Sequence, residues 1–296
     1  MVKVIAALAL MVALGVPGAS APAFDSSRAW ADLRELVAIG PRPAGSPAIE
    51  QARTYIRREL GKAGVAVADQ AWDEPATPIG RVHMVNLRAT IPGASPSRIV
   101  IAGHYDTKLF HEFRFVGAND GGSSAAFLIE LARDLKARRN PLTIEILFLD
   151  GEEAFNHEWA GTDNTYGSRH YVDAARKDGS LASLKAMILV DMIGDRDLRL
   201  KREANSTPWL TDLIWAAASR KQLGDYFVPE RTPIEDDHLP FLEAGVPSVD
   251  IIDLEFAPWH TAGDTLDTVS ARSLQVVGDA LLAALPGVER HIVGSR

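Results

Sequence analysis

Apolar residues along the chain follow two patterns, which predict two kinds of element. In residues 49–63, Ala52, Ile56 and Leu60 recur at a spacing that places them on one face of a helix. Further helices are predicted at 122–137, 208–221 and 270–285. Short apolar runs rich in β-branched residues predict strands at 82–91, 98–102, 143–149, 186–190 and 246–252.

This alternation of strands and helices is typical of an α/β fold with a parallel-rich sheet. Because helices then cover both faces of the sheet, we expect a three-layer α/β/α sandwich around a central, mostly parallel mixed sheet. The sequence shows no internal repeat of about 20–50 residues, which argues against a solenoid or a propeller. No linker-like stretch divides residues 22–296, so we expect them to form one domain.

The first 21 residues have the pattern of a secretory signal peptide. Lys3 supplies a positive start, residues 4–16 form an almost unbroken apolar run, and Ala19-Ser20-Ala21 offers small residues for cleavage. A membrane anchor is the alternative, but the run is shorter than the ~20 residues that a spanning helix needs. We therefore expect segment 1–21 to be removed and the mature protein to be secreted or periplasmic.

The composition is that of a globular protein, with 47% hydrophobic and 24% charged residues in 296. The net charge of −8 provides no basic footprint, so we expect no nucleic-acid partner. After residue 21 no stretch is long and apolar enough to span a bilayer, so we expect no membrane partner for the mature form. The chain has no cysteine, which excludes disulfides, a thiol nucleophile and thiolate metal ligands. Any metal must therefore be bound by His, Asp and Glu.

Polar side chains follow four of the predicted strands at the points where the strands end. These residues are His104 and Asp106 after the second strand, Asp150, Glu152 and Glu153 after the third, Asp191 after the fourth, and His260 after the fifth. In a parallel sheet, ligands bind beyond the carboxyl ends of the strands. A merely solvated surface would scatter such residues over both ends, so this pattern indicates a functional site.

The residue types at these strand ends favour a metal site. Asp120, Glu153 and His260 would give zinc three ligands and leave the fourth position open. Neighbouring residues that leave a strand point in different directions, so Glu152 could handle protons beside the metal. His104 and Asp191 could complete a second site, as in two-metal hydrolases.

Simpler explanations exist for two of these positions. Asp120 lies in Gly117-Ala-Asn-Asp-Gly-Gly122, just before a predicted helix, where it could act as a helix cap or form an Asx-turn. The Glu152-Glu153 pair could belong to an exposed loop. Other catalytic motifs are missing from the sequence, since it contains neither Gly-x-Ser-x-Gly nor the common glycine-rich phosphate loops.

These residues together resemble the M28 family of zinc-dependent peptidases, and within it the glutaminyl-peptide cyclotransferase branch. The motifs shared with the whole family are Gly40-Pro-Arg-Pro-Ala-Gly-Ser46, His104-Tyr-Asp-Thr107, Asn119-Asp-Gly-Gly122, Asp150-Gly-Glu-Glu153, Asp191 and His260. The motifs shared with the branch are Phe115-Val-Gly-Ala-Asn-Asp120, Asp150-Gly-Glu-Glu-Ala-Phe155, Tyr166-Gly-Ser-Arg-His170, Asp191-Met-Ile-Gly194, Glu235-Asp-Asp-His-Leu-Pro-Phe-Leu242, Gly245-Val-Pro247 and Trp259-His-Thr261. They occur in order over residues 28–285.

The resemblance implies a zinc aminopeptidase-like fold and an enzyme that converts the N-terminal Gln of peptides or proteins to pyroglutamate, with release of ammonia. It implies one zinc ion per chain, and we expect the enzyme to be a monomer. The zinc ligands that it implies are Asp120, Glu153 and His260. The catalytic carboxylates that it implies are Glu152 as proton shuttle, Asp191 and Asp236. The aromatic residues that it places around the substrate's glutamine are Trp159, Phe256 and Trp259.

Two other functions stay open beside the cyclotransferase. An M28 aminopeptidase would remove N-terminal residues and bind two metal ions, with His104 and Asp191 in the second site. A non-catalytic binding protein on this scaffold is disfavoured because every candidate ligand and the candidate base are present.

The chain also departs from the branch at several positions. Asp250 stands where animal members carry His, and Ala262-Gly-Asp-Thr265 is closer to the peptidases. Trp159 lies one residue further from Glu153 than the branch predicts. The loop between Asp106 and Phe115 is short, which could open or reshape the pocket.

Overall fold

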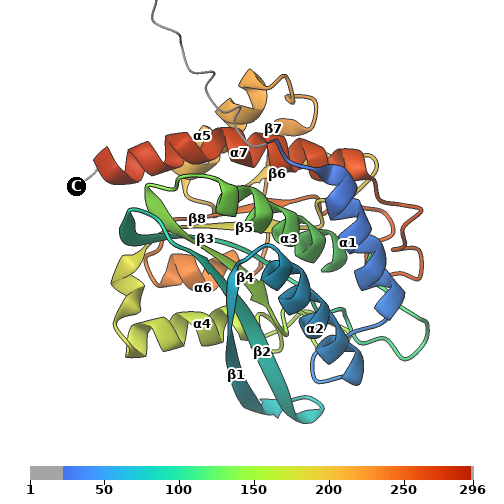
Figure 1. Cartoon of the computed structure of the whole chain (residues 1–296). Coiled ribbons are helices and arrows are strands. Elements are labelled where there is room, and N and C mark those ends of the chain that lie inside the picture. Colours follow the sequence, from blue (N-terminus) through green and yellow to red (C-terminus); the bar gives the residue numbers. More distant parts are fainter. Residues whose placement is uncertain (1–22, 295–296) are drawn as a thin grey trace, which may run out of the picture.

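A six-stranded sheet runs through the centre of the molecule in the computed structural model, which describes residues 23–294 (Figure 1). Its strands lie in the order β1 (Ala66–Thr77), β2 (Gly80–Ile91), β4 (Leu142–Leu149), β3 (Ser95–His104), β5 (Leu184–Asp191) and β8 (Ser248–Ile252). β4, β3, β5 and β8 are mutually parallel, whereas β1 and β2 form an antiparallel hairpin beside β4. The prediction of a mostly parallel mixed sheet is confirmed.

Helices cover both faces of this sheet, which confirms the three-layer prediction (Figure 1). One layer contains α1 (Ser26–Ile39), α2 (Pro47–Lys62), α3 (Gly122–Ala137), α5 (Pro208–Arg220) and α7 (Ala271–Gly294). The other contains α4 (Tyr166–Lys177) and α6 (His238–Glu243). A short 3-10 helix, Ser180–Ser183, leads into β5, and β6 (Leu200–Glu203) pairs with β7 (Phe227–Thr232) in a small second sheet.

The alternation of side chains along each buried strand builds a core on each face. In β3, Ile99 and Ile101 belong to the larger core on the α3 side, whereas Val100 and Ala102 belong to the smaller core on the α4 side. All four side chains are fully buried. Burying a Val or Ile side chain stabilises the fold by roughly 1.5–3 kcal/mol. β3 is thereby fixed from both faces, and with it the strand end that carries His104.

Several elements were not predicted, namely α1, α4, α6, β1, β6 and β7. β1 lies at the sheet edge and alternates exposed with half-buried residues, so it contains no continuous apolar run. Asp25 caps the N-terminus of α1, and its carboxylate accepts hydrogen bonds from the backbone N–H groups of Ser27 and Arg28.

The predicted signal segment 1–21 lies outside the described residues. Between residues 23 and 294, none of the helices combines the length and the apolar character needed to cross a membrane.

Candidate metal centre and active site

The carboxyl ends of the four parallel strands meet at one edge of the sheet and carry the candidate site. His104 ends β3 and pairs in register with Leu149, the last residue of β4. Asp191 ends β5 and pairs with Ile252, the last residue of β8. Glu152 and Glu153 follow β4 directly, and His260 follows β8. The strand-end pattern in the sequence therefore corresponds to residues that are neighbours in space.

The three residues expected to bind zinc form one compact ligand group. One ligand atom from each of Asp120, Glu153 and His260 can be chosen so that all lie within 4.8 Å of one another. Nε2 of His260 is 3.3 Å from Oδ2 of Asp120 and 3.3 Å from Oε1 of Glu153. Those two oxygens and Oε2 of Glu153 are buried and make no hydrogen bond. Buried carboxylate oxygens without donors are costly unless a cation satisfies them, so this group fits a bound metal ion.

Electrostatics lead to the same conclusion for the ligand group. Burial alone would lower the pKa of His260. The carboxylates of Asp120 and Glu153 outweigh this effect and raise the pKa to about 9. Burial would raise the pKa of Asp120, yet its contacts with His104 and His260 hold that pKa below its ordinary value. The group therefore stabilises positive charge at the point where its three side chains converge.

Asp120 does not cap the helix that follows it. The N-cap of α3 is Gly121, and no side chain makes a capping hydrogen bond there. Gly121 has a φ of +74°, and a Cβ at this position would lie 2.3 Å from the carbonyl oxygen of Asp106. The turn thus requires glycine, and it directs the Asp120 carboxylate towards the imidazoles of His104 and His260. The helix-cap explanation of Asp120 is wrong.

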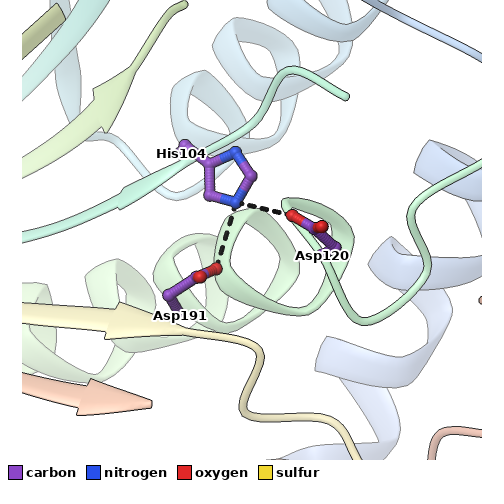
Figure 2. Close-up of side chains that lie close together, drawn as sticks. All are labelled: His104, Asp120 and Asp191. Atoms are coloured by element: carbon purple, nitrogen blue, oxygen red, sulfur yellow. Dashed lines mark hydrogen bonds and ion pairs between the residues drawn. The ribbon is translucent and has the colours of Figure 1, made fainter. Parts of the chain in front are cut away.

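A second group of possible ligands contains His104, Asp120 and Asp191 (Figure 2). Nε2 of His104 lies 3.0 Å from Oδ1 of Asp191 and 3.1 Å from Oδ1 of Asp120. The backbone N–H of Met192 also donates to Oδ1 of Asp191, at 2.8 Å. Asp120 belongs to both groups, so it has the position of a bridge between two adjacent sites.

Glu152 lies beside the first ligand group and is itself buried, as are Asp191 and Asp236. Its Oε2 is 3.6 Å from Nδ1 of His104. Burial raises the pKa of Glu152 well above its ordinary value; His104 opposes this shift, and the carboxylates of Glu153 and Asp236 reinforce it. Burial likewise raises the pKa of Asp236 well above its ordinary value, and the carboxylate of Asp191 raises it in the same direction. Carboxyl groups that exchange protons nearer neutral pH are suited to general acid–base catalysis.

A cavity of about 260 Å³ opens onto these residues. It is lined by Asp120, Glu152, Glu153, Asp191, Asp236 and His260, and by the apolar or aromatic residues Trp159, Met192, Pro233, Ile234, Ile252, Leu254 and Trp259. Both predicted tryptophans thus lie in the wall. The volume is below the roughly 300–1,000 Å³ of most ligand pockets, so the cavity is a small one.

Phe256 does not line this cavity, although the sequence predicted that it lines the substrate pocket. Its side chain is buried and packs with Met192, Ile234 and Ile252, which themselves face the cavity. Phe256 therefore supports the wall from behind. The sequence could not separate these positions, because a buried aromatic residue and a pocket aromatic residue have the same local pattern.

The comparison with known families settles the relationship of the chain. The sequence model described as peptidase family M28 matches residues 86–285. The chain belongs to peptidase family M28.

Individual relatives show to which branch of the M28 family this chain belongs. The glutaminyl-peptide cyclotransferase-like protein of Mus musculus is 32% identical over 272 residues, covering 81% of this chain and 70% of the relative. A glutaminyl cyclase structure from an Acidobacteriales bacterium is 37% identical with a TM-score of 0.87, covering 96% of this chain and 100% of that one. A leucine aminopeptidase precursor from Bacteroides thetaiotaomicron is 26% identical with a TM-score of 0.81, covering 90% and 98%. The chain lies in the glutaminyl-peptide cyclotransferase branch of the family, which confirms the resemblance seen in the sequence.

The M28 site also contains a buried cation that the sequence analysis missed. Lys108 is 2% exposed and lines the cavity. Its Nζ donates to the carbonyl oxygen of Ala154 at 2.9 Å and lies 3.7 Å from Oε2 of Glu153. The sequence feature that could have indicated Lys108 as a site residue is its position directly after His104-Tyr-Asp-Thr107, in the loop that follows a buried strand. Lys108 partly offsets the negative charge of the buried carboxylates.

The loop between Asp106 and Phe115 packs aromatic rings around His260. The ring centroid of Phe110 lies 5.7 Å from that of His260, edge to face, and the centroid of Phe115 lies 6.0 Å away. Trp259 stacks on the same imidazole with centroids 4.2 Å apart. His260 also has a φ of +53°, a strained conformation for a residue other than glycine. The surrounding rings restrict the imidazole, while the strain lies in the backbone of His260.

Proposed function

We propose that this protein is a zinc-dependent glutaminyl-peptide cyclotransferase, which converts the N-terminal Gln of peptides to pyroglutamate and releases ammonia. One observation carries the proposal: the ligand group Asp120, Glu153 and His260 and the carboxyl group of Glu152 line the same small cavity. Membership of the cyclotransferase branch supports the same reaction.

The donor set fits zinc, which binds imidazole nitrogen and carboxylate oxygen and is stable with three protein ligands. Asp120, Glu153 and His260 would hold the ion. When bound, zinc supplies a Lewis acid for the side-chain amide carbonyl of the substrate.

In this proposal Glu152 moves the proton that ring closure requires. The α-amino nitrogen of the substrate forms a bond to the side-chain amide carbon, and the bond from that carbon to the amide nitrogen breaks. The carboxylate of Glu152 accepts a proton from the attacking nitrogen and returns it to the departing nitrogen, which leaves as ammonia. Water is neither consumed nor produced. Because both reacting groups belong to one residue, the cavity needs only to hold that residue in a bent conformation.

Asp236 and Asp191 would orient the substrate's amino group. Both are buried and line the cavity. Oδ1 of Asp236 accepts a hydrogen bond from the backbone N–H of Asp237 at 2.5 Å, whereas its Oδ2 makes no hydrogen bond. Oδ2 therefore has its acceptor capacity available for a donor in the cavity. Trp159 and Trp259 would enclose the aliphatic part of the glutamine side chain.

A metallo-aminopeptidase is the second candidate, because His104, Asp120 and Asp191 form a second ligand group that shares Asp120 with the first. Two adjacent metal ions joined by one carboxylate would suit hydrolysis of a peptide bond.

Mass spectrometry of the products distinguishes the two activities. We expect a Gln-initiated peptide to lose one ammonia while its peptide bonds stay intact, and a Leu-initiated peptide to be unchanged. Release of free Leu or Gln would show the aminopeptidase and overturn the proposal.

We further infer that the mature enzyme is exported and monomeric. The inference of export rests on the sequence of residues 1–21. N-terminal sequencing of protein from the periplasm or medium should start near Pro22, and a mature protein that still carries Lys3 would contradict cleavage. Light scattering should give the mass of one chain.

A further inference from the structure

Asp264 connects two loops that carry candidate metal ligands. It lies four residues after His260, and its carboxylate contacts the turn that contains Asp120. Oδ1 of Asp264 accepts a hydrogen bond from the backbone N–H of Asn119 at 2.7 Å, and Oδ2 accepts one from the backbone N–H of Asp120 at 3.1 Å. The side chain is buried, and its partners lie 145 and 144 residues away in the sequence.

Other contacts hold the Asp120 turn against different parts of the fold. Oδ1 of Asn119 accepts a hydrogen bond from the backbone N–H of Gly194 at 2.7 Å, which ties the turn to the segment after Asp191. The guanidinium group of Arg42 donates to the carbonyl oxygens of Val116 and Gly117 at 2.7 and 3.1 Å. These contacts fix the position of Asp120 relative to the end of β5 and to the loop between α1 and α2, which contains Arg42. The two bonds to Asp264 place it relative to the loop of His260.

The same arrangement occurs at the second carboxylate ligand. The oxygens of Asp106 accept hydrogen bonds from the backbone N–H groups of Glu152 and Glu153, both at 3.3 Å. Asp120 and Glu153 are thus held in the same way. In each case one buried Asp carboxylate accepts hydrogen bonds from the backbone N–H of the ligand and from that of the residue before it. This geometry fixes the backbone from which the ligand side chain extends.

We propose that Asp264 is a positioning residue that holds the Asp120 and His260 loops at the separation that metal binding requires. Without it, the two ligands would belong to loops that can drift apart, and the metal would have to bring them together on binding. The inference rests on the proposed zinc site, and it concerns a segment, Ala262-Gly-Asp-Thr265, to which the proposed reaction assigns no role.

Zinc affinity of purified apo-protein is the direct test, measured by competition with a chromogenic chelator. In Asp264→Asn one acceptor oxygen is replaced by an NH₂ group that faces a backbone N–H. Loss of a residue that orients a metal ligand typically weakens metal binding by about 10- to 100-fold, and we expect a loss of this size. Asp267→Asn is the matched control, since Asp267 is exposed and only three residues away, and it should change the affinity by less than about twofold.

Circular dichroism and thermal unfolding of the apo forms separate positioning from general destabilisation. Asp264→Asn should stay folded without zinc and still bind it weakly; folded protein with wild-type zinc affinity would overturn the proposal. If Asp264→Asn does not fold, Asp264→Glu retains both oxygens but displaces them by one methylene group. Weakened zinc binding by folded Asp264→Glu would support positioning, and wild-type affinity would refute it. Lack of zinc binding by the wild-type protein would instead overturn the zinc site itself, and this inference with it.

Discussion

Oδ1 of Asp120 lies 3.1 Å from Nε2 of His104, while Oδ2 of the same carboxylate lies 3.3 Å from Nε2 of His260. One carboxylate thus links the ligand group proposed for zinc to the second group that contains Asp191. In a one-zinc enzyme, His104 orients Asp120 and Asp191 through hydrogen bonds. In a two-metal enzyme, it would bind the second ion.

Substitution of His104 distinguishes these roles. We expect wild-type protein and His104→Ala each to hold one zinc per chain after dialysis, measured by inductively coupled plasma mass spectrometry. The variant should bind that zinc up to about 100-fold more weakly, because Asp120 loses an orienting partner. Two zinc ions in the wild type and one in the variant would favour the aminopeptidase.

Asp236 is expected to be essential although it is not a zinc ligand. Asp236→Ala should lower kcat/KM by at least about 100-fold, the scale of a lost general acid–base or orienting group, and leave the zinc content unchanged. Glu243→Gln, an exposed carboxylate in the neighbouring helix α6, is the control and should be near wild type. Near-normal kinetics for Asp236→Ala would mean that Asp236 contributes only to the charge of the cavity wall.

Trp259 is 41% exposed at the cavity and stacks on His260, so it can contact both substrate and ligand. Removing its ring should cost about 1–2 kcal/mol of substrate binding, which corresponds to a rise in KM of roughly 5- to 30-fold. Steady-state kinetics on a Gln-peptide, at saturating zinc, measures this change. Trp209→Ala removes a tryptophan that stacks on His291 in α7 and should leave KM unaffected. An unchanged KM in Trp259→Ala would show that Trp259 does not contact the substrate.

Phe256 should behave as a packing residue, in contrast to Trp259. Phe256→Ala is expected to lower the free energy of unfolding by about 3–5 kcal/mol, because it leaves a cavity next to Met192, Ile234 and Ile252. Urea unfolding measures this loss, and Phe256→Leu should recover most of it. A large rise in KM without loss of stability would show instead that Phe256 contacts the substrate.

The sequence was sufficient to predict five of the six strands of the central sheet and to bring most of the candidate site residues together. Parallel strands buried on both faces appear as apolar runs, and their carboxyl ends must meet at one edge. The sequence alone therefore groups His104, Glu152, Glu153 and Asp191. Asp120 has two interpretations in the sequence, because an Asp before a helix is usually a cap, and only the structure shows that Gly121 has that position.

Features that depend on distant contacts could not be predicted. Asp264 binds backbone N–H groups 144 and 145 residues away, and a backbone donor leaves no trace in the sequence. The packing of Phe256 behind the cavity wall could not be predicted either, because the direction of a buried aromatic side chain depends on the loop that carries it. The edge strand β1 has no apolar run that would predict it, because more than half of its residues are exposed.

The most direct test of the central claim is ammonia release from a Gln-initiated peptide, with zinc analysis on the same preparation, for wild type and Glu152→Gln. We expect the wild type to release one ammonia per peptide with one zinc bound. Glu152→Gln should keep its zinc and lose about 100-fold or more of its rate, because the amide cannot accept the proton. Ammonia release at the wild-type rate by Glu152→Gln, or none by the zinc-loaded wild type, would contradict the account.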